Sequence, residues 1–454
     1  MRSNWIIWTS SVLFAAFFTL VTLQPIDDFA DLRGPYCEQI GCCTSRQDTC
    51  SKPIIGTLCY CDDFCNRTDV HDCCPDFWSY CRGIDLPTPL PPTTPRPPPE
   101  EVRSCFHEGR VFFLNQTSKN NCNECRCAQV GSSLEMLCER NVCLIEPDIV
   151  YNVNADFRHG WRASNHSKFW GRTLGDGIRL RLGTLQPQKD VMRMNPVKRY
   201  YDPASLPRQF DSSVNWPRYI TGIQDQGWCG SSWAVSTAAV ASDRYGIISK
   251  GKEEVQLSAQ NIISCIPRSK GCEGGRLDRA WTFVRKYGVV DEPCFPYTGS
   301  NYTRCSIRRI GSLAEAHCIP PRYSERTGRY KVGPAYRLGN ETDIMYEILR
   351  SGPVQATLKI YHDFFSYTGG IYKHTDLSLA HQQGYHSVRI VGWGEEFTSN
   401  GLQKYWKVAN SWGTDWGEAG YFRIVRGVNE CDIEAFVLAV WSEVDRRILV
   451  SNGI

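Results

Sequence analysis

The chain has 454 residues, 42% of them hydrophobic, which is enough for several folded units and at least one large core. Its formal net charge is only +3 and 22% of its residues are charged, so composition gives no argument for a nucleic acid or an acidic molecule as partner, and we expect no nucleic-acid partner. The 23 cysteines, dense in the first third of the chain, predict an oxidising, secretory compartment.

The N-terminus reads as a signal peptide. Arg2 precedes an apolar run over residues 6–18, and no later run is long enough to span a bilayer. We expect cleavage of residues 1–23 and a secreted protein of the extracellular space or matrix. The alternative is an uncleaved signal anchor, because apolar character persists to Leu23 without a clean A-x-A site. Five N-x-S/T sequons predict N-glycosylation at Asn66, Asn115, Asn165, Asn301 and Asn340.

Residues 33–83 form a candidate module with ten cysteines between Cys37 and Cys81. So short a segment cannot bury enough apolar surface alone and must be stabilised by disulfides rather than by a metal. The patterns around Cys59-Tyr60-Cys61 and Cys73-Cys74-Pro75 resemble the somatomedin-B domain, which implies a protein-binding module. The cysteines that carry the resemblance are Cys59, Cys61, Cys65, Cys73, Cys74 and Cys81. That family has eight cysteines, so the two extra ones leave the connectivity open.

Residues 84–101 are mostly proline and threonine, which predicts a stiff spacer. Residues 102–144 then contain six cysteines, an even number that fits three internal bridges. The run Cys122-Asn123-Glu124-Cys125-Arg126-Cys127 is similar to a shortened von Willebrand type C repeat. The resemblance implies contact with proteins or matrix; a purely structural spacer is the alternative.

Residues 145–205 contain no cysteine and include the runs 161–165 and 178–184. These runs resemble the propeptide of cathepsin B, which covers the cleft of an active enzyme and is then removed. The alternation of Ile178, Leu180 and Leu182 with arginines also fits a short strand. Lys198-Arg199 is a candidate processing site, but we expect the segment to be retained, because a site without a nucleophile has no activity to restrain.

Residues 206–454 show helical patterns first and strand patterns afterwards. Helices are expected from residue 232 to about 246, at 258–265, from 277 to about 288 and at 341–349, and strands at 354–360, 386–392, 404–409 and 420–425. This order predicts an α+β fold. From residue 206 to about 441 the chain resembles cathepsin B. The resemblance implies a papain-like fold, with an active-site groove between a helical lobe and an antiparallel, β-barrel-like lobe.

The stretch Gln226-Gly227-Trp228-Cys229-Gly230-Ser231-Ser232-Trp233 ends at an expected helix N-terminus, where partial positive charge favours an anionic side chain. It resembles the nucleophile segment of the papain-like cysteine peptidases, Q-x-x-C-G-S-C-W, with Ser232 in place of the nucleophilic cysteine. A serine hydroxyl does not ionise near neutrality, so the thiolate–imidazolium pair of that family cannot form. The chain is therefore expected to be catalytically inactive.

The other landmarks of a papain-like site are present and in order. The resemblance makes Gln226 the oxyanion-hole glutamine, His386 the catalytic histidine and Asn410 the residue that orients its ring, with Trp412 packed over that contact. Gly274 and Gly275 match the glycine pair that receives an extended substrate.

Seven cysteines lie in this body. The family pairs Cys229 with Cys272, and the resemblance suggests that Cys265 and Cys294 pair with Cys305 and Cys318. Cys431 is then left over as a buried free thiol or, alternatively, an intermolecular bridge.

Two departures from cathepsin B bear on ligands. Only His317 lies between Cys294 and Cys318, so the paired histidines of the occluding loop are missing and dipeptidase behaviour is not implied. Phe436 aligns with the acidic residue of the specificity pocket, so we expect a more apolar pocket that binds a peptide or an acyl chain without cutting it.

The combination of modules resembles the tubulointerstitial nephritis antigen family of secreted, non-catalytic papain homologues. It implies an adhesion or ligand-binding protein that needs no cofactor or metal. The expected partners are matrix or cell-surface proteins, secreted signalling ligands (lipid-modified ones among them) and polysaccharide. The alternatives are a weak serine-type peptidase that uses Ser232, His386 and Asn410, and a decoy that captures substrates or inhibitors of active cathepsins.

Overall fold

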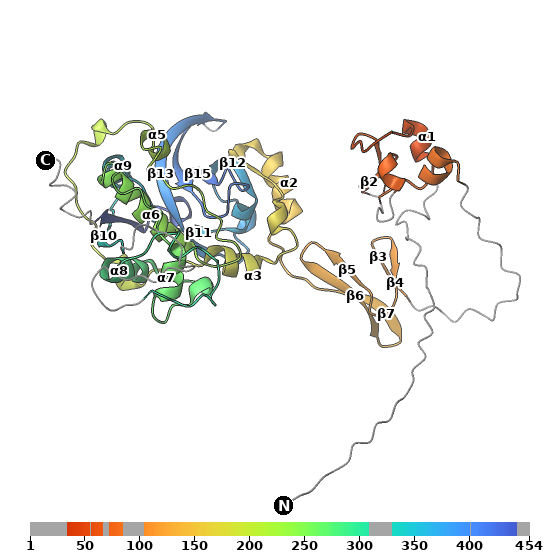
Figure 1. Cartoon of the computed structure of the whole chain (residues 1–454), viewed down its shortest axis with the longest axis horizontal. Helices are drawn as coiled ribbons and strands as arrows, with labels where there is room; N and C mark the ends of the chain where they lie inside the picture. The colour runs from red at the N-terminus through yellow and green to blue at the C-terminus, as the bar shows by residue number, and fades with distance from the viewer. Residues whose placement is uncertain are drawn as a thin grey trace, which may run out of the picture. The chain divides into compact units, whose positions relative to one another are not determined.

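The computed structural model describes residues 34–54, 56–66, 72–84, 104–307, 329–399 and 401–442. The chain divides into two compact units, Met1–Glu101 and Val102–Ile454 (Figure 1). The expected signal peptide, and the expected spacer apart from Ile84, lie outside the described residues.

The first unit is a small module built around disulfides. It contains α1 (Tyr36–Ile40), a hairpin of β1 (Ser51–Ile54) and β2 (Thr57–Tyr60), and helical turns at Asp63–Asn66 and Phe77–Cys81. All ten cysteines pair, and seven of them form the small core together with Ile54 and Phe77. The bridges are Cys37–Cys61, Cys42–Cys81, Cys43–Cys50, Cys59–Cys74 and Cys65–Cys73.

The second unit begins with a second disulfide-rich module. One hairpin joins β3 (Cys105–His107) to β4 (Arg110–Phe112), and a three-stranded sheet joins β5 (Thr117–Asn120), β6 (Asn123–Val130) and β7 (Ser133–Cys138). Its three bridges are Cys105–Cys127, Cys122–Cys143 and Cys125–Cys138.

The segment that resembles a propeptide is built into the body. It contains α2 (Pro147–Ala155), β8 (Trp161–Ala163), α3 (Leu174–Gly177) and α4 (Lys189–Met192). β8 pairs antiparallel with β12 (Tyr367–Tyr372), and α2 lies at that edge, where Asn154 donates to the Ala163 carbonyl (Figure 1). The segment supplies the main core with the buried side chains of Ile145, Ile149, Val153, Trp161, Phe169, Leu174 and Leu182.

The strand alternative for Ile178–Leu182 is wrong, because these residues form a helical turn. The Thr173 side chain accepts from Asp176 N–H and starts α3, which runs directly into the turn. The turn ends at Gly183, whose φ of 94° is left-handed. Helical capping therefore overrides the alternating pattern.

The body has a helical lobe and a sheet lobe. The helical lobe contains α5 (Ser212–Asn215), α6 (Ser232–Ile248), α7 (Ala259–Cys265) and α8 (Leu277–Tyr287), and α6 to α8 enclose one apolar core. In the sheet lobe, a nine-stranded sheet runs in the order β10-β16-β11-β13-β14-β15-β12-β8, with β9 paired to β13. The fold is α+β and papain-like, as predicted.

Most of the expected elements of the body appear within a few residues of their predicted ends. The sheet is formed by β9 (Phe210–Asp211), β10 (Val332–Arg337), β11 (Val354–Ile360), β13 (Gly384–Thr398), β14 (Gly401–Ala409), β15 (Tyr421–Val425) and β16 (Val437–Ser442), together with β8 and β12. α9 (Glu341–Ser351) precedes β11. β13 starts beside α6 and carries His386 to the junction of the two lobes.

Candidate active-site cleft

Ser232 is the first residue of α6, and its side chain is fully buried. Its Oγ lies 2.8 Å from Thr184 Oγ1 and accepts from the backbone N–H of Ser387 at 3.3 Å. The hydrogen-bond partners of Ser232 Oγ among the described residues are thus Thr184 and Ser387 rather than His386.

His386 and Asn410 meet as the resemblance implies. Nε2 of His386 lies 2.7 Å from Asn410 Oδ1, and Ser411 N–H also donates to that oxygen. The Trp412 ring packs against the imidazole with centroids 5.1 Å apart, and Trp412 itself stacks on Phe365. The orienting half of a catalytic pair is therefore intact.

The electrostatics of His386 differ from those of a catalytic imidazolium. Burial lowers the pKa of His386 to about 4, and the charge of Arg181 acts in the same direction. The Asn410 side chain and the backbone of Leu182 oppose this shift. Nδ1 is buried and makes no hydrogen bond of good geometry with the described residues. The ring is therefore neutral near pH 7 and a weak base.

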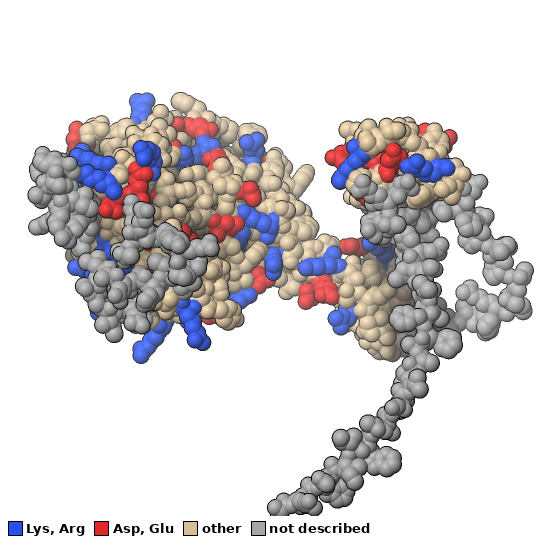
Figure 2. All heavy atoms as spheres, in the orientation of Figure 1, with Lys and Arg blue, Asp and Glu red and all other residues tan. Residues whose placement is uncertain are grey.

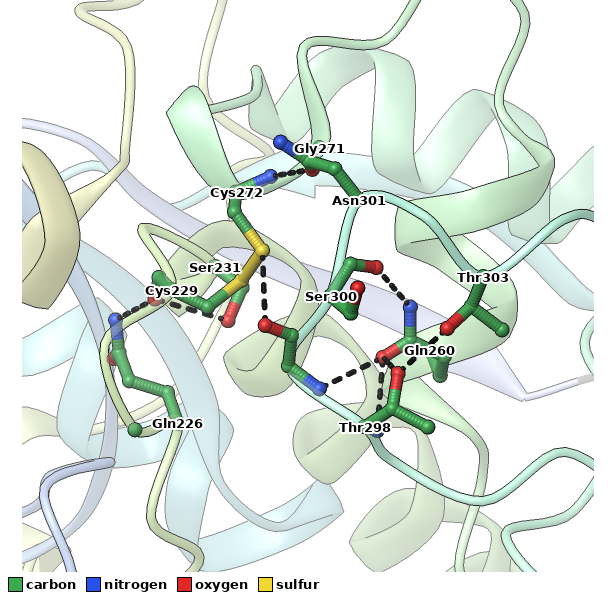
Figure 3. Close-up of a disulfide and its surroundings, with 12 residues drawn as sticks. Gln226, Cys229, Ser231, Gln260, Gly271, Cys272, Thr298, Ser300, Asn301 and Thr303 are labelled. Atoms are coloured by element: carbon green, nitrogen blue, oxygen red, sulfur yellow. Dashed lines mark hydrogen bonds between the residues drawn. A yellow bond between two sulfur atoms is a disulfide. The ribbon is translucent and has the colours of Figure 1, made fainter. Parts of the chain in front are cut away.

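Gln226 also lies in the cleft, with its side chain fully buried. Its Nε2 donates to the Cys229 carbonyl at 2.7 Å and to the Leu182 carbonyl at 3.4 Å, and its Oε1 accepts from Ser411 Oγ. Figure 3 shows the amide pointing to the Cys229 carbonyl. The donor expected for an oxyanion hole is therefore occupied by carbonyls of the chain itself.

Residues 183–185 occupy the place of an extended ligand. The backbone N–H of Thr184 donates to the Tyr385 carbonyl at 3.2 Å, and Leu185 N–H donates to the Gly275 carbonyl at 2.9 Å. Gly275 N–H in turn donates to the Gly183 carbonyl at 2.9 Å. The backbone at Gly275 that the resemblance assigns to substrate thus pairs with the chain's own segment.

A buried arginine anchors this segment. The Arg181 guanidinium donates to Asp225 at 2.6 Å and to the Gly227 carbonyl at 2.8 Å, while it lies over the rings of Phe169 and Trp228. The Trp412 indole donates to the Arg181 carbonyl. Arg181 and Thr184 were missed as site residues in the sequence, because no local pattern shows that they face Asp225 and Ser232.

The remaining binding candidates lie around this segment. A Cβ on Gly274 would lie 2.9 Å from the Gly183 carbonyl oxygen, so Gly274 directly backs the segment. Phe436 is buried and lines an apolar cavity of about 520 Å³ together with Val191, Met194, Trp281 and Leu438. Phe436 thus borders an apolar cavity, and residues of the segment 145–205, among them Val191 and Met194, form part of its wall.

The disulfide Cys229–Cys272 supports the wall of the cleft (Figure 3). Cys272 N–H donates to Asn301 Oδ1 at 2.5 Å, and Gln260 holds the neighbouring loop through Thr298 and Gly299. Cys265 is bonded to Cys305. Cys294 is disulfide-bonded, while Cys318 lies outside the described residues. Cys431 is the free cysteine of the described part, and it is buried.

Four of the predicted glycosylation sites can be placed with their side chains. Asn115, Asn165, Asn301 and Asn340 are exposed. Asn340 Oδ1 caps α9 by accepting from Asp343 N–H, and Asn301 Oδ1 accepts from Cys272. Asn66 lies in the turn Asp63–Asn66 of the first unit.

We expect acid to destabilise the body through His386. The folded pKa of about 4 lies below the ordinary value of 6.5, so the unfolded chain binds more protons between these values. The stabilising contribution is present above about pH 6.5 and is lost as the pH falls toward 4. Linkage gives a loss of about 2 kcal/mol between roughly pH 7 and pH 5. Urea titrations of wild type and His386→Gln at several pH values measure it.

The His386→Gln variant separates the effect of His386 from that of other buried histidines. Burial also lowers the pKa of His362 to about 4, and the acid dependence that His362 causes is the same in wild type and variant. The expected result is a shallower acid dependence in His386→Gln. Equal slopes in the two proteins would show that His386 is not held neutral by burial.

Comparison with known proteins agrees with this fold. Residues 206–441 match the family model of the papain family cysteine proteases. A human tubulointerstitial nephritis antigen-like protein is 46% identical over 435 residues, which cover 91% of this chain and 90% of the relative. The human tubulointerstitial nephritis antigen is 40% identical over 433 residues, which cover 91% and 88%.

A solved structure shares the fold beyond the body. ProCathepsin B S9 from Trypanosoma congolense superposes with a TM-score of 0.57 and 32% identity, covering 66% of this chain and 99% of that chain. The body, the cleft residues and the relatives lead to one assignment. This chain belongs to the papain family of cysteine proteases and, within it, to the family of tubulointerstitial nephritis antigens and their like.

Proposed function

We propose that this chain is a secreted, non-catalytic glycoprotein that acts in the extracellular matrix by adhesion or ligand capture. The observation that carries the proposal is the contact between Ser232 and Thr184. The residue in the nucleophile's place has no thiol, is fully buried, and is hydrogen-bonded to the chain's own segment. A substrate carbonyl has no access to such a hydroxyl.

The 21 disulfide-bonded cysteines of the described residues support an extracellular location. The helices in the described ranges include none with the length and apolar character to cross a membrane. Lys and Arg are interspersed with Asp and Glu on the face shown in Figure 2, so this face lacks the continuous positive surface that favours nucleic acid.

The second disulfide-rich module is a better candidate for the binding surface than the cleft, because residues 183–185 fill the cleft. It exposes 74% of Phe106, 56% of Val111 and 53% of Leu137. Large apolar side chains in this number on a small module are typical of interaction sites. We propose matrix or cell-surface proteins, secreted signalling ligands including lipid-modified ones, and polysaccharide as the classes of partner.

Two assays on the full-length secreted protein test this function. Wild type and Ser232→Ala are expected to give the same background hydrolysis of a fluorogenic peptide. Phe106→Ser is expected to weaken adhesion to matrix proteins, with Tyr302→Ser, on another exposed part of the chain, as a matched control. Turnover by wild type that Ser232→Ala abolishes would contradict a non-catalytic role.

The second candidate is the weak serine-type peptidase, which the intact bond between His386 and Asn410 favours. A histidine with a pKa of about 4 is a poor general base at neutral pH, and Ser232 is engaged by Thr184. The comparison of wild type with Ser232→Ala decides between the two functions.

We further expect the segment 145–205 to be retained in the secreted protein. At the candidate processing site, Arg199 pairs with the buried Glu347 at 3.3 Å and lies over the Trp441 ring. A processing protease would have to remove Arg199 from these contacts. N-terminal sequencing and intact mass of the secreted protein measure the outcome, and a mature N-terminus near Leu206 would contradict it.

A further inference from the structure

Three potential metal ligands meet at a place that the cleft does not use. His374 follows β12, and Glu430 and Cys431 lie in the helical turn Glu430–Asp432 between β15 and β16. Their ligand atoms all lie within 4.8 Å of one another. Glu430 Oε1 is at the centre: His374 Nδ1 lies 2.6 Å away, and the Cys431 thiol donates to the same oxygen at 3.3 Å.

The surroundings hold these groups in place. The Tyr361 ring stacks on His374 with centroids 4.3 Å apart, and His374 N–H donates to Glu430 Oε1. Asn429, Cys431 and Asp432 have left-handed φ values of 55°, 52° and 61°. Such a backbone is strained in residues other than glycine, and here it accompanies a turn in which the Cys431 thiol donates to the neighbouring Glu430 carboxylate. The packing around the turn must offset this strain.

Exposure and charge also suit a cation. Glu430 and Cys431 are each 6% exposed, whereas a quarter of the His374 side chain reaches solvent. The nearby Asp363 is satisfied by Tyr372 and Thr375, and Lys359 is paired with Asp432 at 3.5 Å. A carboxylate and a thiolate at this place would therefore lack a full positive partner, which a divalent ion supplies.

We propose that His374, Glu430 and Cys431 bind a zinc ion, with a fourth position open to solvent beside His374. Imidazole nitrogen, carboxylate oxygen and thiolate sulfur are ligands that zinc takes, whereas calcium and magnesium prefer oxygen alone. On binding, the thiol proton is released to solvent and the imidazole carries its proton on Nε2, so that Nδ1 can coordinate.

Bound zinc would tie the loop after β12 to the turn that precedes β16. Because zinc binds the folded arrangement, it should raise the thermal midpoint. The burial of Cys431 also disfavours the alternative that this cysteine bridges to another molecule.

The test uses the full-length secreted protein, stripped of metal with a chelator. Cobalt(II) serves as the spectroscopic probe, since coordination by a thiolate gives an intense near-ultraviolet charge-transfer band. We expect one cobalt per chain with this band, its displacement by zinc, and a higher thermal midpoint with zinc. Cys431→Ser is expected to lose the band, and His374→Phe, which preserves a ring against Tyr361, to weaken binding by at least about tenfold.

His159→Gln is the matched control, because His159 lies in the separate turn Phe157–His159. The affinity of this variant for cobalt should equal that of wild type. Binding without the thiolate band, or affinity unchanged in His374→Phe, would overturn the proposal. If Cys431→Ser is not secreted, the cobalt affinity of His374→Phe decides whether the site exists. The His374 side chain is partly exposed, and its replacement leaves the buried Cys431 thiol in place.

Discussion

Ser232→Cys is expected to show no activity toward a fluorogenic peptide while residues 183–185 occupy the cleft. The new thiol would lie where Ser232 Oγ now meets Thr184, and the Leu182 carbonyl would still face Gln226. His386 would remain buried, and this burial disfavours an imidazolium beside a thiolate. A nucleophile alone is therefore insufficient.

The double variant Ser232→Cys, Gly183→Ala is expected to hydrolyse the peptide. The second substitution opens the cleft because no side chain fits between Gly183 and Gly230. With water and substrate admitted, His386 is no longer desolvated and Asn410 still orients it. By analogy with triad enzymes, the gain over the serine protein with the same open cleft is on the order of 10⁶ in kcat.

Three controls make this experiment decisive. Gly183→Ala alone measures the peptide hydrolysis of an open cleft that still contains Ser232. Ser232→Cys alone measures the hydrolysis of a closed cleft that contains the new cysteine. The triple variant with His386→Ala should abolish the gained turnover. Silence of the double variant, despite proteolysis that shows the segment released, would mean that the cleft has lost more than its nucleophile. Turnover by Gly183→Ala alone would instead support the serine-type peptidase.

The secondary structure of the body could be predicted because its signals are local. α7 begins after Ser258, whose side chain accepts from Asn261 N–H, and β11 occupies the predicted Val354–Ile360. The apolar periodicity of α8 ends at Gly288, which has a positive φ. Each signal lies within a few residues of the feature that it predicts.

The occupied state of the cleft could not be predicted in the same way. Thr184 and Ser232 are 48 positions apart, and Arg181 and Asp225 are 44 apart. Neither pair belongs to a local pattern, and Ile178–Leu182 alternates like a strand yet forms a helical turn. The resemblance located the segment near the cleft; the contacts that hold it depend on tertiary packing.

Gly183→Ala is expected to expel residues 183–185 from the cleft and to destabilise the body by about 3 kcal/mol. Gly183 has φ 94°, and a Cβ there would lie 1.9 Å from the Gly230 carbonyl oxygen and 2.1 Å from its carbon. Both atoms belong to the backbone two residues before Ser232, so neither can rotate away. Any shift also strains the hydrogen bonds of Thr184 with Tyr385 and of Leu185 with Gly275.

Gly175→Ala is the matched control in the same segment. A Cβ at Gly175 would meet only Thr173 Oγ1, at 3.8 Å, and its backbone is helical, so we expect stability close to that of wild type. Urea titration measures the stability, and limited proteolysis between residues 178 and 205 reports release of the segment. Equal protection of the two variants would contradict the prediction. Faster cleavage of Gly183→Ala alone would show that the crossing of two glycine backbones keeps this cleft closed.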